Sequence, residues 1–158
     1  MTDNYSIFSD KEELTLTIDI TKINSKRINE KVDFLGTITG IQQPQTKLKN
    51  GVFVCKSCLR VHELPQKIFE NGYQQPIVCH ECGGKKFELI LDESTFTEIQ
   101  FIEVGKPDSV KKLKVCVIDS EDMIDEDVLG QSKHIFGKVV LVENKNKFET
   151  VVVCQMWR

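Results

Sequence analysis

The chain has 158 residues, 40% of them hydrophobic, which is enough for one domain with a core or for one domain carrying a small inserted one. Its formal net charge of −3 excludes a basic surface over the whole molecule and confines any nucleic-acid contact to a local patch. No stretch is apolar for long enough to span a bilayer, and residues 1–25 lack the apolar region of a signal peptide. We therefore expect a soluble, cytoplasmic protein with no membrane partner.

The first residues of the chain show no clear hydrophobic pattern, and strand patterns follow them. Residues 1–13 are polar without a clear period, and we expect a loose arm. Alternation of apolar and polar residues predicts a half-buried strand at residues 14–20 and a longer one at residues 32–41. Gly36 and Gly40 inside the longer strand indicate a bulge or bend, which coils a strand around a small barrel.

Four cysteines dominate the next stretch. After an expected loop at residues 42–51 come two C-x-x-C pairs, Cys55 with Cys58 and Cys79 with Cys82, with 20 residues between the pairs. Two such turns bring four sulfurs to one point, as in the closed tetrahedral site of structural zinc. We predict one structural Zn²⁺, with no open position for catalysis. A rubredoxin-like iron site uses the same ligands and is the alternative metal.

The remaining cysteines and histidines have simpler explanations. His62 and His80 lie near the cysteine pairs, but four thiolates complete a zinc site, so we expect packing or surface roles for both rings. Cys116 and Cys154 lie inside apolar runs and are expected to be core thiols.

The second half of the chain consists mostly of strand patterns. Strands are predicted at residues 86–91, 94–104 and 113–118, and a β-hairpin at residues 135–155. Residues 119–127 carry six acidic side chains and predict a short acidic helix. This helix presents a solvated face, and a magnesium site or a partner-binding face are the alternatives.

About five short strands with no strand–helix–strand rhythm predict a mainly β fold, an OB-type five-stranded Greek-key barrel with an inserted zinc ribbon. The expected division is an N-terminal arm at residues 1–19, a barrel at residues 20–54 and 86–158, and a ribbon at residues 55–85. The hairpin entry is basic, because residues 133–147 contain four lysines and one glutamate.

Several motifs follow one another along the chain: residues 23–32 leading into Gly36-Thr-Ile-Thr39, the two cysteine pairs, Ser94-Thr-Phe-Thr-Glu-Ile-Gln100 and Asp122-Met-Ile-Asp125. In this order they resemble the N-terminal OB-fold and zinc-ribbon domain of the archaeal-type MCM replicative helicases. The resemblance extends from about Ile20 to the C-terminus.

The resemblance implies a non-catalytic module for DNA binding and oligomerisation in DNA replication. In that family the ribbon joins subunits head to head in double hexamers, and a β-hairpin points basic residues at DNA in the channel of the ring. The corresponding metal ligands are Cys55, Cys58, Cys79 and Cys82, and the corresponding DNA-binding residues are Lys138, Lys145 and Lys147. The implied partners are weakly bound single-stranded DNA, further copies of the chain in a homo-oligomer or hexameric ring, and replication proteins. An archaeal protein of this kind would be nucleoid-associated.

The chain also departs from the family pattern. There is no room for the helical subdomain before the barrel, and no G-x-x-x-x-G-K-[ST] motif of the AAA+ ATPase module, so we expect no enzymatic activity. Glu103 stands where the family often has an arginine. The alternative function is a zinc-ribbon protein-interaction module, which would bind replication partner proteins through the ribbon and residues 119–127, and not DNA. Under the DNA-binding hypothesis, further phosphate contacts are expected from Lys106, Lys111, Lys112 and Lys114.

Overall fold

The computed structural model describes residues 4–8, 13–118 and 124–158, with the backbone alone described for residues 4–8, 13 and 14. The chain divides into two compact units, Met1–Gln45 with Ile99–Arg158, and Thr46–Glu98. The second unit extends beyond the ribbon expected at residues 55–85, because most of one long strand before the cysteines folds with it. None of the described helices is long and apolar enough to cross a membrane.

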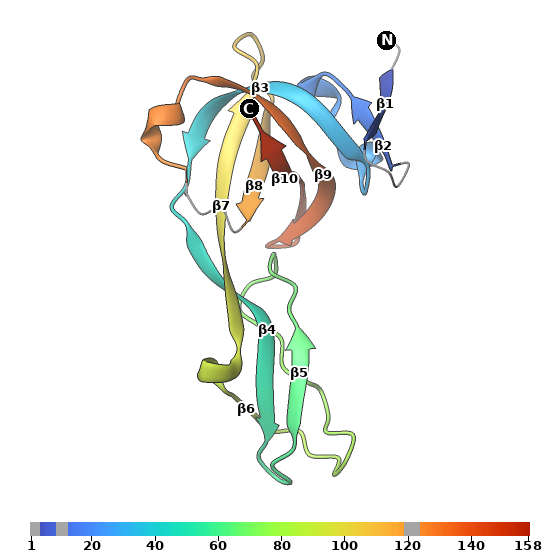
Figure 1. Cartoon of the computed structure of the whole chain (residues 1–158), viewed down its shortest axis with the longest axis vertical. Helices are drawn as coiled ribbons and strands as arrows, with labels where there is room; N and C mark the ends of the chain where they lie inside the picture. Colours follow the sequence, from blue (N-terminus) through green and yellow to red (C-terminus); the bar gives the residue numbers. More distant parts are fainter. Residues whose placement is uncertain (1–3, 9–12, 119–123) are drawn as a thin grey trace. The chain divides into compact units, whose positions relative to one another are not determined.

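Five strands close a barrel in the first unit (Figure 1). They are β3 (Lys31–Ile41), β7 (Thr95–Gly105), β8 (Lys112–Ile118), β9 (Ser132–Asn144) and β10 (Lys147–Trp157). Antiparallel pairing joins β3 to β7, β7 to β8, β9 to β10 and β9 back to β3, and parallel pairing joins β8 to β10. This closed order is the Greek-key arrangement of an OB fold, so the predicted fold class is confirmed.

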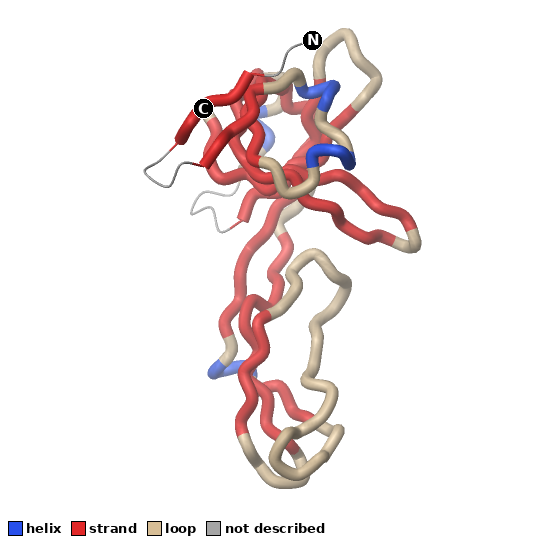
Figure 2. Tube along the Cα trace, turned by 90° about the vertical axis from the view of Figure 1, so that its right-hand side faces the viewer, coloured by secondary structure: helices blue, strands red, loops and turns tan. Residues whose placement is uncertain are grey.

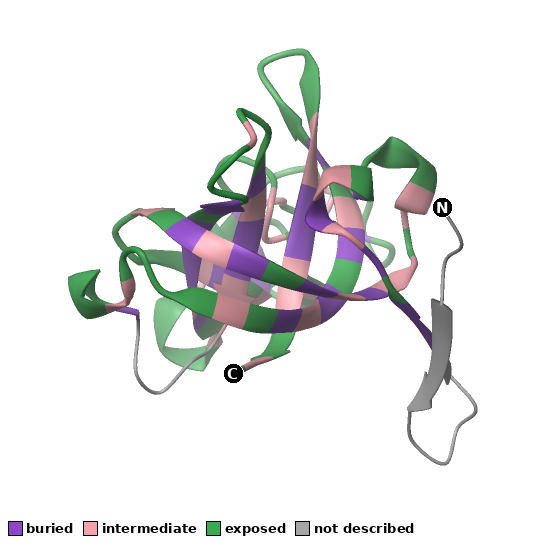
Figure 3. Cartoon of the chain, turned by 90° about the horizontal axis from the view of Figure 1, so that it is seen from above, coloured by how far each residue is buried: buried purple, intermediate pink, exposed green. Residues whose placement is uncertain are grey.

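Alternation of side chains along β3 builds the barrel core. Val32, Phe34 and Ile38 are at most 1% exposed, and Figure 3 shows buried and exposed positions alternating along the barrel strands. The register between β3 and β7 shifts between Ile38 and Gly40, which is the irregularity that the glycine predicted. The opposite set of β3 residues is half-buried or exposed and includes Leu35, which is 61% exposed.

The N-terminal segment contains more structure than its sequence indicates. Strand β1 (Asn4–Phe8) pairs with β2 (Glu13–Thr17), which runs parallel to β3, so the prediction of a loose arm is wrong for these residues. Single 3-10 turns follow at η1 (Ile20–Lys22) and η2 (Ser25–Arg27). The prediction overlooked a short alternation, in which Tyr5 and Ile7 follow the polar Asn4 and Ser6, and the backbone pairing with β2 identifies the segment as a strand.

The predicted acidic helix falls only partly on the described residues. Residues 119–123 lie outside them, and Glu126–Val128 forms one 3-10 turn, η4. The segment is anchored by the buried Gln100 side chain, whose Oε1 accepts from the Ile124 amide at 2.7 Å and whose Nε2 donates to the Ile124 carbonyl at 2.8 Å.

The second unit contains a small sheet built around strand β4 (Figure 2). Strand β4 (Gln45–Cys55) pairs with β5 (Val61–Pro65) on one side and with β6 (Phe87–Leu89) on the other, and η3 (Leu91–Glu93) follows. The loop predicted at residues 42–51 is therefore mostly strand. Its polar residues gave no strand signal, because the pairing is carried by the backbone and only Leu48 of residues 45–50 is buried.

Candidate metal centre and nucleic-acid interface

Each cysteine pair lies on a turn of the same construction. The Leu59 amide donates to the Cys55 carbonyl and the Gly83 amide to the Cys79 carbonyl, both at 2.8 Å. Leu59 and Gly83 both have left-handed backbone conformations, with φ of 65° and 75°. Glycine adopts this conformation without strain, so Gly83 could be anticipated from the sequence, whereas the leucine gives no such signal.

The two turns bring four sulfurs together. The Sγ atoms of Cys55, Cys58, Cys79 and Cys82 all lie within 4.8 Å of one another. The Cys55 and Cys82 sulfurs are 3.5 Å apart, and those of Cys58 and Cys79 are 3.6 Å apart. Four sulfurs at about 2.3 Å from a tetrahedral zinc ion are roughly 3.8 Å from one another. The arrangement therefore fits a tetrahedral four-thiolate metal site.

The clustered thiols differ in their pKa values, because backbone amides and the other sulfurs affect each of them differently. Amide donation from Cys58, assisted by Ser57, lowers the pKa of the Cys55 thiol to about 6 despite its desolvation. The Gly84 amide lowers the pKa of Cys82, but the neighbouring Cys55 sulfur and desolvation outweigh it and raise that pKa to about 12. Four thiolates can coexist at this spacing only when a bound cation offsets their charge.

Neighbouring residues pack directly against the four-sulfur cluster. A Cβ atom added to Gly84 would lie 3.1 Å from the Cys55 sulfur and 3.2 Å from that of Cys82, so a side chain there would press on the site. Within the described residues, the metal-competent cluster contains the four cysteines and neither histidine. The His62 ring instead packs edge-on against Phe87, with the ring centroids 5.4 Å apart, which agrees with the predicted packing role.

The β9–β10 hairpin ends in a two-residue turn. Lys145 and Asn146 both have positive φ, 49° and 65°, which makes the turn type I′. Lys145 and Lys147 are exposed at this tip. Lys138 is not part of it: it pairs with Lys31 of β3 and lies seven residues before Lys145, about 24 Å along an extended strand.

Most of the other candidate lysines of the barrel are engaged in intramolecular contacts. Lys114 forms an ion pair with Glu149 at 3.0 Å, and Lys106 forms one with Asp19. Lys111 donates to backbone carbonyls of residues 21 and 23. Sequence reasoning could not foresee these contacts, since their partners lie 35 to 90 positions away along the chain.

Two aromatic side chains near the C-terminus differ in how far they are free to contact a ligand. Phe148, directly after Lys147, is 65% exposed. Trp157 lies under the Lys133 ammonium, 5.7 Å from the ring centroid. Phe148 is therefore the aromatic ring that the structure presents next to the basic turn.

A closed five-stranded barrel with a four-cysteine ribbon inserted between its first and second strands defines an OB-fold protein with a candidate metal centre. The family model described as the MCM OB domain matches residues 19–142, and the chain belongs to this family. No curated protein matches the chain.

Among solved structures, the chain is similar to the N-terminal domain of an archaeal MCM, determined at 1.8 Å. The TM-score is 0.74 at 21% sequence identity, over 90% of this chain and 61% of that one. This similarity shows a shared fold, and the chain spans about 61% of the length of the archaeal domain. The match to the family model confirms the predicted family.

Proposed function

We propose that this chain is a non-catalytic MCM-type module that binds DNA and assembles with further copies of itself during DNA replication. The supporting observation is the exposed pair Lys145 and Lys147 at the β9–β10 turn of a closed OB barrel. This turn connects the fourth and fifth barrel strands, and in OB folds that loop is one of the oligonucleotide-binding loops.

The preferred ligand is single-stranded DNA. The ammonium groups of Lys145 and Lys147 supply phosphate contacts, and Phe148, 65% exposed beside them, offers a face on which a base can stack. Two phosphate contacts make binding weak and sensitive to salt, with a slope of about −1.4 in a plot of log affinity against log salt concentration. Lys138 contributes only if the strand continues along β9 toward the barrel.

We assign one structural Zn²⁺ to Cys55, Cys58, Cys79 and Cys82. When bound, zinc cross-links the two turns and neutralises part of the thiolate charge. Four protein ligands leave no position for a substrate, which agrees with a non-catalytic module. The ring assembly is proposed from membership of the MCM family, and light scattering with and without an oligonucleotide tests it.

Fluorescence anisotropy with a labelled single strand at two salt concentrations tests the DNA contact. The double variant Lys145→Glu with Lys147→Glu is expected to lose at least about tenfold in affinity, since each lysine contact is replaced by a repulsion. A control with the same change in net charge is Lys22→Glu with Lys26→Glu, two exposed positions outside the hairpin. Equal losses in the two double variants would refute a specific hairpin contact.

A protein-interaction module is the second candidate, and one observation favours it. Leu59, Val61 and Ile77, close in sequence to the cysteines, are 73%, 59% and 87% exposed. Exposed aliphatic groups that form a contiguous patch mark protein contacts. If the hairpin variant binds DNA like the wild type, while Ile77→Ser with Leu59→Ser abolishes capture of a replication protein, this second function replaces the first.

A further inference from the structure

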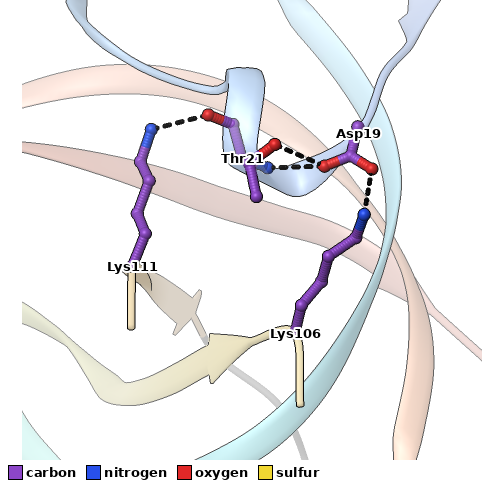
Figure 4. A network of polar contacts seen from close by, with 4 residues as sticks. All are labelled: Asp19, Thr21, Lys106 and Lys111. Carbon is purple, nitrogen blue, oxygen red and sulfur yellow. Dashed lines mark hydrogen bonds and ion pairs between the residues drawn. The ribbon is translucent and has the colours of Figure 1, made fainter. Parts of the chain in front are cut away.

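The loop between β7 and β8 is tied at both ends to one turn of the chain before the barrel. Figure 4 shows Lys106 and Lys111 reaching the η1 turn from opposite ends of the loop. Lys106 forms an ion pair with Asp19, and Lys111 donates to the carbonyls of Thr21 at 2.8 Å and Ile23 at 3.2 Å.

The two lysines stabilise the two ends of η1 in different ways. Asp19 is the N-cap, and its Oδ1 accepts from the Thr21 amide at 2.9 Å and from the Thr21 hydroxyl at 2.7 Å, while Oδ2 faces Lys106. Lys111 places its ammonium at the other end, where the carbonyls of a helical turn carry partial negative charge.

The loop is exposed, and its contacts with η1 through Lys106 and Lys111 are polar. Between residues 106 and 111 every position is exposed except Ser109, which is half-buried, and Val110 is 99% exposed. The Lys106 and Asp19 side chains retain 45% and 22% exposure. Because the exposed Lys106–Asp19 ion pair is weak and screened by salt, a polyanion can compete for the Lys106 ammonium. The Lys111 ammonium bonds neutral carbonyls, and an anionic phosphate offers it a charged acceptor in their place.

One of these lysines also lies beside the proposed DNA-binding hairpin. Lys111 lines a cavity of about 520 Å³ together with Lys112, Lys114, Glu149 and Thr150. Glu149 and Thr150 belong to β10 and follow Lys147 by two and three positions, so this cavity begins at the base of the hairpin.

We propose that the β7–β8 loop is an autoinhibitory latch, which withholds Lys106 and Lys111 from DNA phosphates while it is closed on η1. This inference rests on the proposed DNA-binding function. Opening the latch would add up to two phosphate contacts to those of the hairpin. Each added contact would steepen the salt slope for a single strand by about 0.7.

The variant Asp19→Asn tests the latch, because asparagine keeps the N-cap bond to Thr21 but removes the charge that holds Lys106. Asp108→Asn is the matched control, since it removes the same charge from the exposed loop itself without changing the partner of Lys106. We expect tighter single-strand binding for Asp19→Asn than for Asp108→Asn, a salt slope steeper by about 0.7, and loss of this gain when Lys106→Gln is added.

A DNA-free readout separates the latch from the proposed function. In limited acetylation followed by mass spectrometry, Lys106 and Lys111 should react more slowly than the neighbouring Lys112, and Asp19→Asn should speed the reaction of Lys106. Equal reactivity of the three lysines, or equal DNA binding by Asp19→Asn and Asp108→Asn, would overturn the latch. Absence of DNA binding by every variant would refute the proposed function and the withholding of lysines from DNA, while acetylation would still show whether the loop closes.

Discussion

Removing one sulfur should unfold the ribbon unit and leave the barrel intact. The buried cluster of this unit contains three apolar side chains besides cysteines, Leu48, Phe53 and Phe87. At about 2 kcal/mol each, their burial contributes roughly 6 kcal/mol. Structural zinc contributes about 10 kcal/mol or more in small zinc domains, so the metal dominates. We expect Cys79→Ser, which removes a ligand only 1% exposed, to melt the unit.

Backbone amide NMR resolves the two units separately. In Cys79→Ser, or after chelation of the wild type, signals from residues 46–98 should collapse to the unfolded range while those of residues 99–118 and 124–158 persist. Metal analysis should find one zinc ion per wild-type chain. Cys154→Ser is the control, because this half-buried thiol belongs to the other unit and lies outside the sulfur cluster. A ribbon that keeps its dispersed signals without metal would refute the reasoning.

Three smaller perturbations test the barrel. Gly137→Ala should lower the free energy of unfolding by about 3 kcal/mol, because the new Cβ would lie 2.3 Å from the Val153 carbonyl oxygen; an unchanged thermal midpoint would contradict this close approach. Gln100→Ala should cost a similar amount, about 3 kcal/mol in urea unfolding, since it leaves the Ile124 amide and carbonyl without their buried partners, and a loss below about 0.5 kcal/mol would argue against the anchor. The Lys106 ammonium holds the pKa of Asp19 well below its usual value. The ionised Asp19 carboxylate therefore stabilises the fold above about pH 4, and this stabilisation is lost as the pH falls further. The difference in unfolding free energy between wild type and Asp19→Asn should stay constant from pH 7 to pH 5 and shrink below pH 4.

The sequence by itself determined the features that depend on local pattern. Alternation and its glycine irregularity predicted β3, and the spacing of the two C-x-x-C pairs predicted the gathering of four sulfurs. Both signals are local, because a strand repeats every two residues and a C-x-x-C turn aims its own two sulfurs. The count of short strands was enough to identify a small barrel.

Tertiary structure alone decided the features carried by backbone pairing and by distant charges. Strand β1 carries only a four-residue alternation and the first half of β4 carries none, so pairing within the fold identifies both as strands. The sequence showed Lys106 as one more basic group available to phosphate, whereas the fold places Asp19, 87 positions away, against its ammonium. Which lysines remain available to a ligand is set by such long-range contacts, because a charge is neutralised by its neighbours in space and not by those in sequence.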